Sequence, residues 1–184
     1  AKYDDPIAIL HLANIYKSQN DFDKAIEMST QAYQLRKQLD DKRGIVSSLL
    51  ELGLIYQYIG DIDVALERLR MAHTVAESMN DRVTLAELKQ GEAEILLNDN
   101  LFEEAYTKAN EVLKTVSDIT NQKLFIRASL VKGKYLLHQK QYSLALQTFE
   151  DVIAKSKLAG NLIYEIDAVG SAALCYQALG NTSK

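Results

Sequence analysis

The chain has a single proline, Pro6, among 184 residues, and it has no tryptophan. It contains no Asn-Gly or Asp-Gly pair, and runs that alternate apolar and polar residues are rare. Because such pairs and alternations are typical of hairpin turns and strands, their scarcity disfavours a sheet and favours helices throughout. Pro6 follows Asp4 and Asp5, and proline suits the first turn of a helix because its missing N–H is not needed there.

Cysteine and histidine are also scarce. The one cysteine, Cys175, excludes an internal disulfide and any metal site built from several cysteines. The three histidines, His11, His73 and His138, have no metal-ligand spacing to one another or to Cys175. We therefore expect neither a metal nor a cofactor.

Long apolar runs and clusters of basic residues are missing as well. The longest apolar runs are only a few residues, which disfavours a membrane-inserted segment and a signal peptide. The formal net charge is -4 and the basic residues are scattered, so a nucleic-acid partner is not expected. We expect a cytoplasmic location, or a periplasmic one if the chain belongs to a membrane-anchored sensor.

No motif indicates an enzyme. The sequence has neither of the glycine-rich phosphate-binding patterns, G-x-G-x-x-G and G-x-x-x-x-G-K-[ST]. Cys175 has no histidine nearby in sequence, so it is interpreted as a small core residue rather than as a nucleophile. Acidic pairs such as Glu103-Glu104 fall at expected helix starts, where capping and the helix dipole explain them. No catalytic residue is predicted.

What the sequence does contain is an internal repeat with a period of 40 residues. Three columns define it: a small residue, a Tyr or Leu three positions later, and an alanine twelve positions after the first. The small residues are Ala13, Gly53, Ala93, Gly133 and Ala173. The second column is Tyr16, Tyr56, Leu96, Leu136 and Tyr176, and the third is Ala25, Ala65, Ala105 and Ala145. Such a period indicates stacked structural repeats.

Each repeat is predicted to be a pair of amphipathic helices, because apolar residues recur at three- and four-residue spacing. Short breaks separate the two helices of a pair at Asn20-Asp21, Gly60-Asp61, Asn100 and Gly180-Asn181. Gly and Asn suit the left-handed end of a helix, and the following Asp caps the next one. In the fourth unit the break is Lys140-Gln141, which is a weaker turn. The units are 6–40, 41–80, 81–120, 121–160 and a half unit 161–184, giving nine helices in one domain, 1–184.

This pattern resembles the tetratricopeptide repeat, most closely in the stretches LANIYKSQNDFDKAIEMSTQA and LGLIYQYIGDIDVALERLRMA. The resemblance implies an all-α, right-handed α-solenoid of antiparallel helix hairpins. The small residue lets the two helices of a hairpin cross closely. HEAT and armadillo repeats have similar periods but lack the small, aromatic, turn and alanine spacing.

The period is longer than the 34 residues usual in the family. The proline that normally ends the second helix is replaced by Lys37, Glu77, Ser117 and Lys157, so the helix can continue. The sequence therefore resembles the longer subclass of kinesin light chains, Leu-Gly-Asn repeat adaptors and bacterial Rap-type regulators.

The resemblance also implies a ligand groove lined by the first helix of each unit. Carried over by alignment, its candidate residues are Asn14, Lys17, Leu50, Leu54, Tyr58, Glu87, Glu94, Asn98, Arg127, Lys134 and His138. The alternative is that the leucines are ordinary packing residues and the charges a solvated face. The expected partner is a protein or an extended peptide.

The last predicted helix keeps an apolar face, and the chain stops at Lys184, one residue before the next repeat alanine is due. We therefore expect a fragment of a longer protein, or a homodimer formed through this helix. The predicted function is a non-catalytic interaction scaffold or sensor segment, in the manner of bacterial signalling proteins. The alternatives are a Rap-type regulator that binds a signal peptide, and an accessory domain of an enzyme whose catalytic part lies outside the chain.

Overall fold

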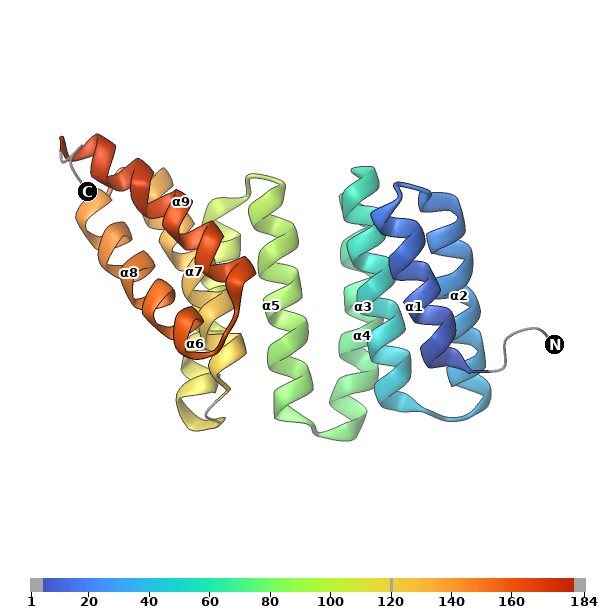
Figure 1. Ribbon diagram of the computed structural model, residues 1–184. Helices are drawn as coiled ribbons and strands as arrows, with labels where there is room; N and C mark the ends of the chain where they lie inside the picture. The colour runs from blue at the N-terminus through green and yellow to red at the C-terminus, as the bar shows by residue number, and fades with distance from the viewer. Residues whose placement is uncertain (1–4, 120, 181–184) are drawn as a thin grey trace. The chain divides into compact units, whose positions relative to one another are not determined.

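A computed structural model describes residues 5–119 and 121–180, with the side chains of 117–119 excepted. The described residues form nine α-helices and no strand (Figure 1), as the repeat predicted. The helices are α1 (Pro6–Ser18), α2 (Phe22–Gln38), α3 (Lys42–Ile59), α4 (Ile62–Met79), α5 (Arg82–Asn98), α6 (Phe102–Ile119), α7 (Gln122–His138), α8 (Tyr142–Leu158) and α9 (Leu162–Ala178). Consecutive helices run antiparallel as hairpins (Figure 1).

The chain divides into two compact units, with the boundary between Gly91 and Glu92 inside α5. In the first unit α1 packs on α2, α2 on α3, and α3 on α4. In the second unit α6, α7, α8 and α9 pack in the same consecutive way, and α7 also contacts α9. The odd-numbered helices, the first of each repeat, are called A helices below, and the even-numbered ones B helices.

The turns follow a 20-residue rhythm in backbone conformation. Among the described residues, those with positive φ lie in the turns that follow the helices, at Asn20, Asp40, Gly60, Asn80, Asn100, Lys140, Gly160 and Gly180. These are mostly the Asn, Asp and Gly residues that tolerate the left-handed region, so the predicted breaks are confirmed there. Residues 181–184, which include the Asn181 of the last predicted break, lie outside the described residues.

Aspartates cap the N-terminal ends of several helices. The side chains of Asp21, Asp41 and Asp61 accept hydrogen bonds from backbone N–H groups three residues on. Gln141 makes no such bond, in line with the weaker turn expected at Lys140-Gln141. Asn161 makes none either, although the sequence pattern placed it at a junction like the others.

Each hairpin depends on a close crossing at the small column, and the sizes across that crossing are complementary. A Cβ placed on Gly53 would lie 2.4 Å from Leu69 Cδ1 and 3.3 Å from the Ala65 carbonyl oxygen. A Cβ on Gly133 would lie 2.5 Å from the Phe149 ring. Where the A helix carries alanine, the equivalent B position is small: Ser29 for Ala13 and Ala109 for Ala93. The glycines are therefore packing residues whose missing side chain is filled by the other helix.

Helix α9 packs against the rest of the second unit through only one of its faces. Cys175 is fully buried among α7 and α8 residues, which confirms its interpretation as a core residue, and burial raises the pKa of its thiol. Ala173, which the repeat places in the small column, is exposed, because no described helix crosses α9 on that side. Ile166 and Val169 on the same side are 62% and 48% exposed.

Replacing Gly133 with alanine should destabilise the fold. The added methyl collides with a buried phenyl ring, which costs about 1–3 kcal/mol, against roughly 1 kcal/mol gained in helix propensity. We expect the free energy of unfolding in urea to fall by up to about 2 kcal/mol. Gly170→Ala is the matched control, since a Cβ there meets no atom within 4 Å, and it should be neutral or stabilising. Equal effects of the two variants would contradict the crossing argument.

Candidate binding surfaces

The predicted groove residues of the first unit all lie on A helices. Asn14 is half-buried on α1, and its side-chain amide donates to the Leu10 carbonyl oxygen at 3.2 Å. On α3, Leu50 packs against the buried cluster around Leu49, and Leu54 is half-buried. Glu87 on α5 is exposed and makes no ion pair with any described residue.

In the second unit the predicted charged residues already form ion pairs. The Arg127 guanidinium binds both carboxylate oxygens of Glu94, with Nε–Oε1 and Nη2–Oε2 distances of 2.8 and 2.6 Å. Lys134 Nζ lies 2.7 Å from Asp167 Oδ2 on α9. Each pair joins an A helix to the next A helix, between residues 33 positions apart. These three predicted charged residues are therefore already paired within the fold.

The first unit has one comparable ion pair, between Lys17 on α1 and Glu51 on α3, whose side chains are 20% and 12% exposed. The position equivalent to Glu94 and Lys134 holds Asn14 and Leu54 instead, which carry no charge. Glu87 occupies the position equivalent to Arg127 and Asp167. In this register the first unit therefore retains an uncommitted carboxylate beside an apolar side chain.

Tyr164 on α9 lies near the Glu94–Arg127 pair. Its phenol is partly buried and packs against the core of α7, α8 and α9. Desolvation raises the pKa of Tyr164, and the Arg127 charge partly opposes that rise. No metal-binding cluster of His, Cys, Asp or Glu occurs among the described residues.

Two other predicted residues stack on the preceding B helix. The Tyr58 ring lies over Phe22, with centroids 6.4 Å apart, and the His138 ring lies over Phe102 at 3.9 Å. The two pairs are equivalent, since Phe22 and Phe102 both begin B helices and Tyr58 and His138 both fall near A-helix ends. These rings therefore contribute to packing between repeats. Asn98, the remaining predicted residue, is exposed at the end of α5.

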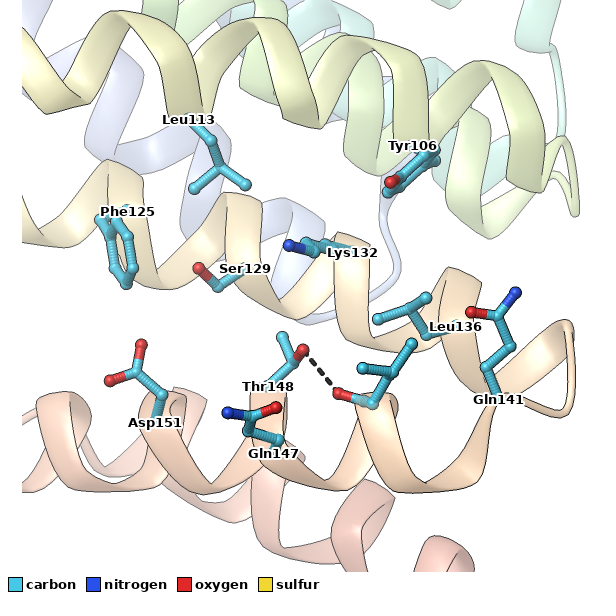
Figure 2. A pocket seen from close by; sticks show the side chains of 11 residues that line it. Tyr106, Leu113, Phe125, Ser129, Lys132, Leu136, Gln141, Gln147, Thr148 and Asp151 are labelled. Atoms are coloured by element: carbon cyan, nitrogen blue, oxygen red, sulfur yellow. Dashed lines mark hydrogen bonds between the residues drawn. The ribbon is translucent and has the colours of Figure 1, made fainter.

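A cavity of about 730 Å³ lies elsewhere, between α6 and α8 with α7 as its floor (Figure 2). The figure shows Leu113 on one side, Ser129 and Lys132 on the floor, and Thr148 on the other side. The lining comprises Tyr106, Leu113, Phe125, Ser129, Lys132, Leu136, Gln141, Leu144, Gln147, Thr148 and Asp151. The sequence prediction included none of these residues, because the family resemblance directs attention to the opposite face of the A helices.

The described helices and their close crossings define an all-α protein of stacked helix hairpins. The sequence profile of the tetratricopeptide repeat matches residues 5–78. That stretch consists of tetratricopeptide repeats, and the resemblance read from the sequence is confirmed. No curated protein matches the chain in sequence. None of the helices in the described part is long and apolar enough to span a membrane.

Several solved structures share the fold over nearly the whole chain. A signal transduction ATPase with numerous domains (STAND) and a tetratricopeptide repeat sensor, from Pyrococcus horikoshii, aligns with a TM-score of 0.78 at 19% identity. The alignment covers 96% of this chain and 27% of that one, so the chain spans about a quarter of that protein. BtubC from P. vanneervenii aligns with a TM-score of 0.74 at 19% identity, and the alignment covers 95% of this chain and 72% of that one. A putative kinesin light chain from Podosopora anserina aligns with a TM-score of 0.70 at 17% identity, and the alignment covers 94% of this chain and 85% of that one.

The Glu94–Arg127 pair should be a measurable clasp between repeats. Its side chains are only 30% and 18% exposed, and its bidentate geometry limits exchange with water. A double-mutant cycle with Glu94→Gln and Arg127→Gln should give a coupling of about 1 kcal/mol in urea unfolding, reduced at high salt. The more exposed Asp151–Lys155 pair, at 3.5 Å, is the control and should give roughly 0.5 kcal/mol or less. Equal couplings would contradict the clasp.

Proposed function

We propose that the chain is a non-catalytic interaction module that binds an extended peptide segment of a partner protein on the A helices of its first unit. Tetratricopeptide repeats are typically interaction modules rather than enzymes, and the chain carries them. The fold supplies A helices whose outward side chains are held in register by the crossings behind them.

The observation that carries the proposal is the difference between the two units at one register position. In the second unit this position is closed by the Glu94–Arg127 and Lys134–Asp167 pairs. In the first unit the position holds the half-buried, uncharged Leu54, and Glu87, its counterpart in register, has no ion-pair partner among the described residues. An apolar contact next to an uncommitted carboxylate suits a peptide with a basic residue beside an apolar one.

A sensor role is our preferred form of this function. It is supported by the Pyrococcus horikoshii ATPase, whose tetratricopeptide repeats are described as a sensor. A signal-peptide regulator of Rap type and an accessory domain of a larger enzyme are the alternatives, and both also use a peptide or protein ligand. Placement in a bacterial signalling protein and a cytoplasmic location remain part of the proposal, as does dimerisation through α9.

Leu54→Glu should abolish peptide binding. The test is selection of peptides from a random library on the 184-residue chain, followed by calorimetry with the synthetic peptides selected. Selected peptides should contain Lys or Arg beside an apolar residue, and Glu87→Gln should lower their binding affinity about tenfold. Leu158→Glu, at a side chain 85% exposed, is the control and should leave binding unchanged. Arg127→Glu is a poor test, because it breaks the clasp to Glu94. Selected peptides that bind Leu54→Glu normally would refute the proposed site.

A further inference from the structure

The cavity over α7 exists because small and polar side chains stand where the first unit has large ones. The chain supplies its own comparison, since α2, α3 and α4 are the equivalents of α6, α7 and α8, 80 residues earlier. Ser129 corresponds to Leu49 and Lys132 to Leu52, and both leucines are buried, at 1% and 5% exposure. The two buried leucines of α3 are thus replaced on α7 by a hydroxyl group and an ammonium group.

On the α8 side of the cavity, too, side chains are shorter than their equivalents on α4. Thr148 corresponds to Arg68 and Asp151 to Met71. In the first unit the Arg68 guanidinium lies over the Tyr56 ring at 5.8 Å and its Nη1 reaches Met71 Sδ at 3.5 Å, so these side chains cover the helix behind them. Thr148 instead turns its hydroxyl back to the Leu144 carbonyl oxygen at 2.8 Å (Figure 2). The shorter side chains leave the space between α6 and α8 open.

The polar groups at the cavity floor are available to a ligand. Among the described residues Lys132 makes no ion pair and Ser129 makes no side-chain hydrogen bond, although Ser129 is only 5% exposed. Leu113, Phe125 and Leu136 supply apolar surface around them. At the far end Asp151 lies 3.5 Å from Lys155, which also lies over the Phe125 ring at 5.0 Å. Lys132 is thus the cation left to meet an acidic group.

The dimensions favour an extended peptide. The lining runs along α8 from Gln141 to Asp151, ten helical steps or about 15 Å, which an extended chain covers in four or five residues.

We propose that the cavity between α6 and α8 binds a short extended peptide in which an acidic side chain pairs with Lys132 and apolar neighbours contact Leu113, Phe125 and Leu136. This site goes beyond the proposed function: it shares no residue with the surface around Leu54 and selects the opposite charge.

The test uses the 184-residue chain and blocked five-residue peptides with one Glu among Leu, Val and Phe, alongside matched sets with Gln or Lys in place of Glu. Binding is followed by fluorescence anisotropy, and amide chemical-shift changes locate it. We expect Glu peptides to bind at least about tenfold tighter than Gln peptides, as a charge-assisted hydrogen bond implies. The shifts should map to α6, α7 and α8.

Two variants copy the first unit and so place side chains that the repeat already accommodates. Ser129→Leu should place an isobutyl group on the cavity floor and so block binding, and Lys132→Leu should remove the preference for Glu over Gln. Thermal unfolding checks that both variants fold, and Leu54→Glu should leave this binding unchanged. Normal binding by Ser129→Leu, or an unchanged preference in Lys132→Leu, would overturn the proposal. So would shifts of the same amides by 4-phenylbutyrate but by none of the peptides, which would indicate a small carboxylate ligand.

Discussion

The close approach of the two helices in each hairpin is the contact on which the other features depend. At Gly53 and Gly133 the A helix contributes no side chain, and Leu69 or Phe149 of the B helix fills the space at the backbone. Because interiors are packed without voids, a B residue of this size fits only opposite glycine. The crossing fixes the rotation of each A helix, and therefore which of its side chains point away from the hairpin.

Contacts between successive hairpins are less uniform than contacts inside them. In the first unit the buried Arg36 of α2 donates through Nη1 to the Gly44 carbonyl oxygen and to Ser48 Oγ of α3, at 2.8 and 2.9 Å. The equivalent residues are Ala76, Val116 and Ser156, none of which reaches as far. The second unit relies instead on the ion pairs of Glu94 and Lys134. A charge on an A helix can therefore serve either a ligand or the next repeat.

Local features of this fold could be predicted from the sequence because they depend on nearby residues. Helix ends follow from Asp caps and left-handed Asn or Gly residues, and the crossing follows from the recurring small residue. The partners of Arg127 and Lys134 could not be predicted, since alignment to a family gives the direction of a side chain but not what lies opposite it. The cavity was not predicted for a related reason. It forms where a side chain is smaller than its equivalent in another repeat, and that difference appears only when Ser129 is compared with Leu49.

That pairing shows what an internal repeat offers beyond fold recognition. Positions that keep one character in every unit, such as Ala25 and Ala65, satisfy a packing demand that all units share. Where a buried apolar side chain is exchanged for a charged one, as from Leu52 to Lys132, about 1.5–3 kcal/mol of stabilisation from burial is lost. The fold does not require that exchange, because the first unit manages without it. Such positions are where function is to be sought, on the B-helix side at Lys132 as much as on the A-helix side at Leu54.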